Sequence, residues 1–386
     1  MSERPTVLSV FGTRPEAIKM APVVRALTAH GQAVRSQICV TAQHRHMLDQ
    51  VLSIFDLRPD HDLDLMQPDQ NLGQLTGAVL NGLGEILGDV RPAFLVVQGD
   101  TTTTFAASLA AFYAGVPVAH VEAGLRTGNV LAPWPEELNR RLTSTIASLH
   151  FAPTEGARQN LLREGVPSAR IQVTGNTVVD ALRVMTDLLD RDAALEGRLA
   201  RQFPFLDPRR RLVLVTAHRR ESFGEDFEHI CTALLELLRR HPDVEIVYPV
   251  HLNPRVREPV ERILGRVGDG GRSERMHLIE PIEYLPFVHL LRRAYLLITD
   301  SGGIQEEATA LGKPVLVMRD VTERPEAVAA GAARLVGTNV ERILGEARAL
   351  LLDQKQYDAA AQATSVFGDG RAGERIAAAI IRELGR

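Results

Sequence analysis

The chain has 386 residues, of which 45% are apolar, and its formal net charge is −4. Because a typical domain has about 100–200 residues, this length predicts two domains with buried cores. The near balance of 44 basic and 48 acidic residues argues against general binding to nucleic acid or to a membrane surface. Apolar stretches are all shorter than the roughly 18 residues of a membrane span, so we expect a cytoplasmic protein.

Short β-branched segments alternate with amphipathic helical stretches along the chain. In the first half the predicted strands are residues 6–11, 35–41, 93–98, 117–121, 149–152 and 171–173. In the second half they are residues 212–217, 245–249, 277–279, 296–299 and 314–318. This alternation predicts an α/β protein with two doubly wound, Rossmann-like domains and a cleft between them. Ligand chemistry is then expected after the carboxyl ends of the strands.

The predicted domain boundaries follow from a short crossing segment at residues 174–177. We expect a first domain at 1–175, a second at 176–370, and a last helix at 371–386 that packs back toward the first domain. A helix that starts near Val178 with Thr177 as its N-cap keeps the linker short. Such a linker allows hinge closure over the cleft.

The loop after the first strand, Gly12-Thr13-Arg14-Pro15-Glu16-Ala17-Ile18-Lys19, carries two cations near a predicted helix start. Gly12 suits a tight turn, and Pro15 suits a first helical position. Arg14 and Lys19 therefore lie near a strand end, where they could bind an anion. The alternative is that both are solvated surface charges.

Three carboxylates occupy successive loops of the first domain. They are Asp100 in Gly99-Asp100-Thr101-Thr102-Thr103, Glu122 in His120-Val121-Glu122-Ala123-Gly124-Leu125-Arg126 and Glu136 in Pro135-Glu136-Glu137-Leu138-Asn139-Arg140. Asp100 has the alternative role of a helix N-cap, and Glu136 that of complementing a helix dipole. Carboxylates clustered at one edge of a sheet shift one another's pKa, which can yield one base and one acid.

In the second half a Ser-Gly-Gly turn, Ser301-Gly302-Gly303, joins a buried strand to a helix. Glycine backbone can approach a ligand closely, and a helix start presents N–H groups, so the turn suits a phosphate. Glu306 and Glu307 lie one turn further along. They either complement the helix dipole or hold a ribose diol, as a carboxylate does in other nucleotide folds.

Further cationic residues follow other strands of the second half. His218, Arg219 and Arg220 come directly after one strand, and His251 follows the next. A lone histidine is more often structural, but one beside two arginines can donate to a phosphate or move a proton. Arg324 follows a later strand and could reach the same phosphate.

No metal-ligand pattern is convincing. His44 and His46 lack a carboxylate partner, and Cys39 and Cys231 lie far apart within apolar stretches. We therefore expect neither a metal site nor a disulfide.

Six motifs follow one another over nearly the whole chain. They are the runs quoted above at 12–19, 99–103, 120–126 and 135–140, then His218-Arg219-Arg220-Glu221 and Asp300-Ser301-Gly302-Gly303-Ile304-Gln305-Glu306-Glu307. In this order they resemble the bacterial non-hydrolysing UDP-N-acetylglucosamine 2-epimerases, from about residue 6 to residue 376. The resemblance implies a glycosyltransferase-B-like fold, a homodimer and no metal or nicotinamide cofactor. It further implies interconversion of UDP-GlcNAc and UDP-ManNAc, which supplies ManNAc units for cell-surface polysaccharide.

The resemblance also implies a mechanism. The proton on sugar C2 is not next to a carbonyl, so anti elimination of UDP to 2-acetamidoglucal, followed by syn re-addition, would invert C2. Transferred motif by motif, the roles are proton transfer for Asp100, Glu122 and Glu136; phosphate contact or proton transfer for His218; sugar and diphosphate contact for Arg14 and Lys19; phosphate contact for Ser301, Gly302 and Gly303; ribose contact for Glu307; leaving-group contact for Arg324; and uracil contact for Phe287.

Bacterial members are also similar in holding a second, activating UDP-GlcNAc beside the active site. The candidate residues here are Gln43, Gln70, Glu136, Arg219 and His251. This chain has His46 where other members have Gln. Activation would require that the second sugar nucleotide favour the closed state.

Three rival functions fit a similar nucleotide site. A glycosyltransferase would need an acceptor pocket and would leave C2 unchanged, whereas the three carboxylates favour epimerisation. A hydrolysing epimerase differs only in that water, rather than UDP, traps the glucal. A sensor would bind UDP-GlcNAc and leave it unaltered.

Overall fold

The computed structural model of the protein describes residues 4–41, 45–67, 70–268, 273–362 and 365–385. The chain forms two compact units: unit 1 is Met1–Arg183 with Phe367–Arg386, and unit 2 is Val184–Val366. The first division falls inside helix α7 (Thr177–Arg191) rather than at residue 175, and residues 367–370 belong to unit 1.

Among the described residues, unit 1 contains a seven-stranded parallel sheet in the order β3-β2-β1-β4-β5-β6-β7. Its strands are β1 (Thr6–Phe11), β2 (Arg35–Val40), β3 (His61–Asp62), β4 (Phe94–Gln98), β5 (Val118–Val121), β6 (Leu149–Ala152) and β7 (Ile171–Val173). Its helices, besides α7, are α1 (Arg14–Ala29), α2 (Arg45–Ile54), α3 (Leu72–Val90), α4 (Thr102–Tyr113), α5 (Glu136–Ile146), α6 (Glu155–Arg163), α16 (Ala372–Leu384) and the 3-10 turn η1 (Ser168–Arg170).

The described part of unit 2 contains a six-stranded parallel sheet in the order β10-β9-β8-β11-β12-β13. Its strands are β8 (Arg211–Thr216), β9 (Val244–Pro249), β10 (Met276–Ile279), β11 (Leu296–Thr299), β12 (Val315–Val317) and β13 (Ala333–Leu335). Its helices are α8 (Ala193–Ala200), α9 (Glu225–Arg240), α10 (Pro254–Ile263), α11 (Tyr284–Arg293), α12 (Gly302–Ala310), α13 (Pro325–Ala329), α14 (Val340–Leu352), α15 (Gln354–Ala360) and the 3-10 turn η2 (Arg220–Ser222).

The central strands are buried on both faces, which is why they appear in the sequence as continuous apolar runs. Every residue of β4 and of β11 is buried. The eleven predicted strands are all present, each within one residue at either end. The strands β3 and β13, which are two and three residues long and lie at sheet edges, were not predicted.

In both sheets the strand order reverses beside a central strand. β1 lies between β2 and β4, and β8 lies between β9 and β11. Such a position is called the topological switch point of the sheet. Open α/β sheets bind ligands there, outside the carboxyl ends of the strands. The loops found there are 12–13 and 99–101 in unit 1, and 217–219 and 300–301 in unit 2.

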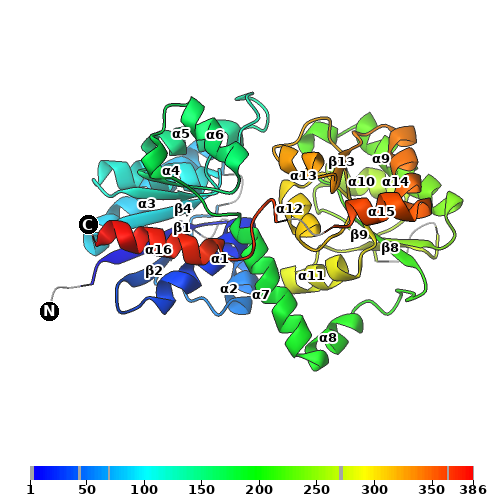
Figure 1. Cartoon of the computed structure of the whole chain (residues 1–386), viewed down its shortest axis with the longest axis horizontal. Helices are drawn as coiled ribbons and strands as arrows, with labels where there is room; N and C mark the ends of the chain where they lie inside the picture. Colours follow the sequence, from blue (N-terminus) through cyan, green and yellow to red (C-terminus); the bar gives the residue numbers. More distant parts are fainter. Residues whose placement is uncertain (1–3, 42–44, 68–69, 269–272, 363–364, 386) are drawn as a thin grey trace. The chain divides into compact units, whose positions relative to one another are not determined.

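The last helix returns to unit 1, where α16 packs on α1 (Figure 1). The contact is close, because a Cβ added to Gly373 would lie 2.7 Å from the carbonyl oxygen of Pro22. The N–H of Gly373 donates to the Asp180 carboxylate over 2.7 Å, which ties the start of α16 to α7.

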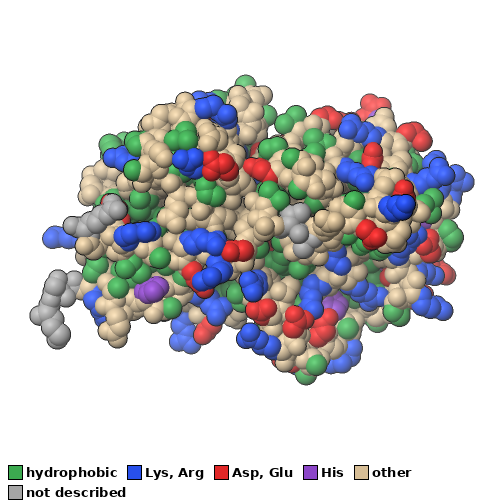
Figure 2. All heavy atoms as spheres, viewed as in Figure 1, with side chains coloured by type: hydrophobic (Ala, Val, Ile, Leu, Met, Phe, Trp, Pro, Cys, Tyr) green, Lys and Arg blue, Asp and Glu red, His purple; other side chains and the backbone are tan. Residues whose placement is uncertain are grey.

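Basic and acidic side chains are interspersed over the surface in view (Figure 2), in line with the small net charge. No helix within the described residues is both long enough and apolar enough to cross a membrane.

Candidate active site

Glu16 joins the two loops at the switch point of unit 1. Its buried carboxylate accepts hydrogen bonds from the N–H groups of Gly12 (3.2 Å) and Thr13 (2.8 Å), and Thr13 and Glu16 form a capping box at the start of α1. It also accepts bonds from the hydroxyls of Thr101 (2.7 Å) and Thr104 (3.1 Å) near the start of α4. Burial raises the pKa of Glu16, and these hydrogen bonds oppose the rise. One side chain therefore ties the loop after β1 to the loop after β4.

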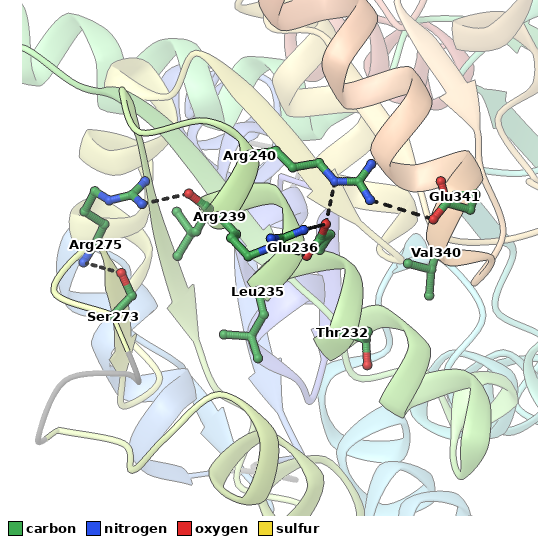
Figure 3. A pocket seen from close by; sticks show the side chains of 10 residues that line it. Thr232, Leu235, Glu236, Arg239, Arg240, Ser273, Arg275, Val340 and Glu341 are labelled. Carbon is green, nitrogen blue, oxygen red and sulfur yellow. Dashed lines mark hydrogen bonds and ion pairs between the residues drawn. The ribbon is translucent and has the colours of Figure 1, made fainter.

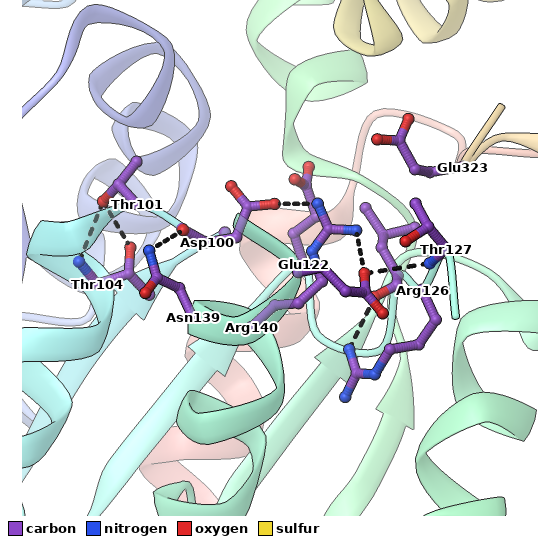
Figure 4. A network of polar contacts seen from close by, with 12 residues as sticks. Asp100, Thr101, Thr104, Glu122, Arg126, Thr127, Asn139, Arg140 and Glu323 are labelled. Atoms are coloured by element: carbon purple, nitrogen blue, oxygen red, sulfur yellow. Dashed lines mark hydrogen bonds and ion pairs between the residues drawn. The ribbon is translucent and has the colours of Figure 1, made fainter. Parts of the chain in front are cut away.

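Asp100 is held by two neighbouring side chains (Figure 4). Its carboxylate pairs with the guanidinium of Arg140, and Asn139 Nδ2 donates to its carbonyl oxygen over 3.0 Å. The preceding Gly99 has a φ of +76°, and its carbonyl oxygen lies 2.8 Å from His120 Nε2. The next residue, rather than Asp100, is the N-cap of α4, so the capping alternative is wrong. The Asp100 side chain is 25% exposed, which leaves the oriented carboxylate accessible.

Glu122 follows β5 in a left-handed backbone conformation, with a φ of +63°. For a residue with a side chain this conformation costs roughly 1–2 kcal/mol, and such strain persists only where the surrounding structure holds it. Lys19 Nζ lies 2.5 Å from Glu122 Oε2, and Asn176 Nδ2 donates to the same oxygen over 2.6 Å. Two donors from distant parts of the sequence thus fix one carboxylate oxygen.

The two predicted cations of the first loop differ in their surroundings. Lys19 is half-buried on α1 and pairs with Glu122, so it is not a solvated surface charge. Arg14 is the first residue of α1 and is also half-buried.

Two adjacent glutamates at the start of α5 also differ. Glu137 is fully buried and accepts hydrogen bonds from the N–H groups of Thr127 (3.1 Å) and Gly128 (3.3 Å) and from Arg140 (3.3 Å). Glu136 is half-buried, and its side chain makes no hydrogen bond or ion pair with another described residue. Glu137 therefore supports the loop, while Glu136 remains available for substrate or for the helix dipole.

In unit 2 the buried carboxylate of Asp300 shapes the loop after β8. Its Oδ2 accepts hydrogen bonds from the N–H groups of His218 (2.6 Å) and Arg219 (2.7 Å), and its Oδ1 lies 3.4 Å from His218 Nδ1. The His218 ring is 41% exposed and stacks on His251 with centroids 5.4 Å apart. Burial and the nearby His218 lower the pKa of His251. Asp300 thus fixes the backbone of the loop and faces the His218 ring.

The Ser-Gly-Gly turn begins α12 as predicted. Ser301 is the N-cap but makes no side-chain capping bond, and the first N–H groups of a helix have no acceptor within it. A Cβ on Gly302 would lie 3.0 Å from the guanidinium carbon of Arg324, whereas a Cβ on Gly303 would have no described atom within 4 Å apart from its chain neighbours and the backbone of its own helix. Arg324 Nε donates to the buried Glu306 over 2.7 Å. The start of α12 therefore lies beside a guanidinium that Glu306 orients, and Glu323 lies 3.5 Å from the same guanidinium.

Glu307 and Phe287 lie close to this turn along the chain but are largely covered. Glu307 is 5% exposed, and its Oε1 accepts a hydrogen bond from the hydroxyl of Tyr284 over 2.7 Å. Phe287 on α11 is 9% exposed. Their predicted contacts with ribose and uracil stay predictions.

The residues predicted for a second sugar-nucleotide site are distributed over both units. Gln43 lies outside the described residues. Gln70 and Glu136 are half-buried in unit 1, whereas Arg219 is half-buried and His251 exposed in unit 2.

The sequence motifs predicted no role for five residues that organise the loops: Glu16, Asn139, Arg140, Asn176 and Asp300. Glu16 has a local signal, because a threonine three residues before a glutamate is the mark of a capping box. Asn176 has none, since its partner lies 54 positions away in sequence.

A separate hollow of 750 Å³ lies in unit 2 (Figure 3) and includes none of the predicted residues. It is lined by Thr232, Leu235, Glu236, Leu238, Arg239, Arg240, Ser273, Arg275, Val340 and Glu341. Arg239 and Arg240 pair with Glu236, and Arg275 donates to the Leu238 carbonyl near the end of α9. These cations are engaged in holding α9 and its surroundings together.

The two switch points are suited to different chemistry. Unit 1 presents oriented carboxylates, which can remove and return protons. Unit 2 presents helix N–H groups, an arginine and an accessible histidine, which can bind a phosphate.

Comparisons with known proteins point to one family. The family model described as UDP-N-acetylglucosamine 2-epimerase matches residues 25–381. The UDP-N-acetylglucosamine 2-epimerase of Escherichia coli strain K12 is 57% identical over 374 residues, which is 97% of this chain and 98% of that protein. The one from Neisseria meningitidis strain Z2491 is 49% identical over 376 residues, covering 97% and 99%.

Solved structures give the same result. The crystal structure of UDP-GlcNAc 2-epimerase from Neisseria meningitidis bound to UDP-GlcNAc has a TM-score of 0.93 at 48% identity, covering 98% of this chain and 100% of that one. The structure of S. aureus MnaA with UDP has a TM-score of 0.88 at 41% identity, covering 99% and 97%. These neighbours have the glycosyltransferase-B fold, so the predicted fold class, with two Rossmann-like domains, is confirmed.

Proposed function

The chain belongs to the UDP-N-acetylglucosamine 2-epimerase family, and from this premise we propose that it interconverts UDP-GlcNAc and UDP-ManNAc without hydrolysis. The family resemblance drawn from the six motifs is thereby confirmed. The observation that carries the proposal is the pair of oriented carboxylates in unit 1. Asp100 is held by Arg140, and Glu122 is held by Lys19 and Asn176.

The proposed reaction proceeds in two stages. A base removes the proton from sugar C2 as the bond between C1 and the diphosphate oxygen breaks, which gives 2-acetamidoglucal and UDP. A proton is then delivered to C2 from the other face, and the diphosphate oxygen attacks C1. We assign these proton transfers to Asp100, Glu122 and Glu136, and each could contribute about 10²- to 10⁴-fold to the rate.

The departing diphosphate requires stabilisation, for which unit 2 is suited. Ser301 and the N–H groups of Gly302 and Gly303 would bind phosphate at the start of α12, with Arg324 beside them. Arg324 is oriented by Glu306, and its planar guanidinium suits two-point contact with a phosphate. His218 would contact the phosphates or take part in proton transfer.

The remaining contacts complete the substrate site. Arg14 and Lys19 would orient the sugar and diphosphate, and in this assignment Lys19 also neutralises Glu122. Glu307, oriented by the Tyr284 hydroxyl, would bind the ribose, and Phe287 would lie near uracil.

We infer the regulation and the biological role of the protein from the same family membership. A second, activating UDP-GlcNAc would use Gln43, Gln70, Glu136, Arg219 and His251. The protein would act as a cytoplasmic homodimer that supplies ManNAc units for polysaccharide.

Proton NMR of UDP-GlcNAc incubated with the protein in heavy water tests the proposal. We expect UDP-ManNAc with deuterium at C2 and an intact link to UDP. Free ManNAc and UDP would instead indicate a hydrolysing epimerase. Unchanged substrate would overturn the epimerase proposal and favour the transferase or the sensor.

A further inference from the structure

Two chain segments that connect unit 1 with unit 2 meet within unit 1. Gly175 has a φ of +88°, and a Cβ added there would lie 2.9 Å from Gly368 Cα and 3.2 Å from the carbonyl oxygen of Phe367. The N–H of Asn176 donates to that carbonyl over 2.6 Å. The outgoing and returning segments are therefore in direct backbone contact.

The side chain of Asn176 points from the contact between these two segments to Glu122. Asn176 is 1% exposed, and its Oδ1 accepts the N–H of Val178 in the first turn of α7 over 3.2 Å. This bond assigns the amide orientation, because the oxygen must face the N–H and the nitrogen must face the other way. Nδ2 then donates to Glu122 Oε2 over 2.6 Å.

The two donors on this oxygen come from different parts of unit 1. Lys19 is on α1 beside the switch point, and Asn176 is on the segment that leads into α7. A single donor leaves a carboxylate room to rotate, whereas two donors from separate elements define its plane. Because Glu122 also has a strained backbone, its position depends on these side-chain contacts.

We propose that Asn176 is a positioning residue for the reaction. Its amide fixes the Glu122 carboxylate relative to the two segments that connect the units. The role rests on the proposed epimerase function. A movement of the crossing segments would be transmitted through the Asn176 amide to Glu122. The expected size of the effect is large for a residue that touches no substrate, since a misplacement of about 1 Å can cost about 100-fold in rate.

The alternative is that Asn176 only stabilises the start of α7. The variant Asn176→Asp separates the two roles. Aspartate keeps the oxygen that accepts from Val178, and it is as good a residue at a helix start as asparagine. It also replaces the N–H donor with a second carboxylate oxygen that faces Glu122, and a like charge raises the pKa of one of the pair.

The test compares wild type, Asn176→Asp and Asn176→Ala by kcat, KM, the pH dependence of kcat and thermal stability. For Asn176→Asp we expect kcat to fall by at least about tenfold at neutral pH, with KM within about threefold. The two facing carboxylates titrate as a pair, so the limb of the pH profile that reports this pair should move to higher pH whether Glu122 acts as acid or as base. Besides Lys19, His120 interacts electrostatically with Glu122, and Arg126 and Arg140 interact electrostatically with His120. All four residues are the same in the variants that are compared.

Asn160→Asp is the matched control. Asn160 Nδ2 donates to the carbonyl oxygen of Gly124 over 2.8 Å, in the same loop as Glu122 but without touching the carboxylate. Its kcat and pH profile should match wild type. Wild-type kcat and pH limb in Asn176→Asp would overturn the positioning role, as would loss of stability without loss of kcat in Asn176→Ala. A wild-type protein that does not epimerise would overturn the proposed function itself, and this role with it.

Discussion

The switch points of units 1 and 2 share a topology but use carboxylates differently. In unit 1, Asp100 and Glu122 each receive a cation from the same unit, which orients them while Asp100 stays partly accessible. In unit 2, Asp300 and Glu306 are completely buried and hold a loop backbone and Arg324 in place. Under the proposed function, carboxylates at the same edge of two similar sheets would be reacting groups in one unit and structural supports in the other.

The largest effect should follow Glu122→Gln. The amide keeps the size of the side chain but cannot take up a proton, so we expect kcat to fall by about 10²- to 10⁴-fold while UDP affinity stays within about threefold. Deuterium incorporation at C2 and calorimetric titration with UDP measure the two quantities. Glu164→Gln is the control, because Glu164 pairs with Arg126 in the same unit but its side chain is 30% exposed. Normal turnover in Glu122→Gln would remove Glu122 from the reacting groups.

Acid should destabilise unit 1 through two buried histidines. Burial lowers the pKa of His120 to about 4 and that of His150 to about 3, against 6.5 in an unfolded chain. Below pH 6.5 the unfolded chain binds protons that the folded unit does not. Stability is therefore lost as pH falls from about 6.5 toward 4, by at most about 1.4 kcal/mol per pH unit for each histidine.

Hydrogen exchange of the β5 and β6 amides at two pH values measures this loss. His150→Asn should make protection there less sensitive to acid. His229→Asn provides the contrast in unit 2, since His229 is 45% exposed and should leave the pH dependence of β5 and β6 unchanged. If the pH dependence of protection in β5 and β6 is the same in His150→Asn as in wild type, His150 does not contribute to the loss of stability in acid.

Asp300→Asn should favour the His218 tautomer with its proton on Nε2, because the carboxylate oxygen 3.4 Å from Nδ1 favours a proton on Nδ1 instead. The amide oxygen can still accept the N–H groups of His218 and Arg219, but its NH₂ group would then face His218 Nδ1. That nitrogen must become an acceptor, which moves the proton to Nε2. We expect kcat to fall by about 10- to 100-fold. Nitrogen NMR of labelled histidine reads the tautomer directly, and an unchanged His218 tautomer would show that Asp300 acts on the backbone alone.

The smallest effects should separate the two glycines of α12. Gly302→Ala displaces Arg324, and we expect UDP affinity to fall about tenfold, equivalent to about 1.4 kcal/mol. Gly303→Ala meets no described atom and should stabilise the helix by about 0.5–1 kcal/mol. If phosphate binds there as proposed, Gly303→Ala should also weaken UDP binding. Thermal unfolding and UDP titration distinguish these outcomes, and unchanged UDP affinity in Gly303→Ala would place the phosphate elsewhere.

The fold was largely predictable because buried parallel strands are continuous apolar runs, and every such run became a strand. The strand-end rule then located Asp100, Glu122 and His218 near the switch points. The neighbouring pair Glu306 and Glu307 shows what a local sequence pattern cannot predict. Both are buried on α12, yet one holds Arg324 and the other a tyrosine hydroxyl, and only tertiary contacts distinguish them.

Contacts between distant residues were the part that sequence did not reveal. Asn176 and Glu122 are separated by more than 50 residues, and no periodicity connects an amide at a chain crossing with a carboxylate after β5. The pairing of Lys19 with Glu122 was likewise missed, since each residue alone looked like a substrate contact. Such partners follow from the assembled sheet and not from any single motif.

The return of α16 to α1 has a consequence for synthesis on the ribosome. Unit 2 is one continuous segment and can fold as soon as it emerges, whereas the surface of α1 that receives α16 stays uncovered until the last helix has been made. At about 5–20 residues per second, that interval is roughly 20–70 s. The half of the molecule translated first is thus the half completed last, and nascent chains should need protection at α1 for most of their translation.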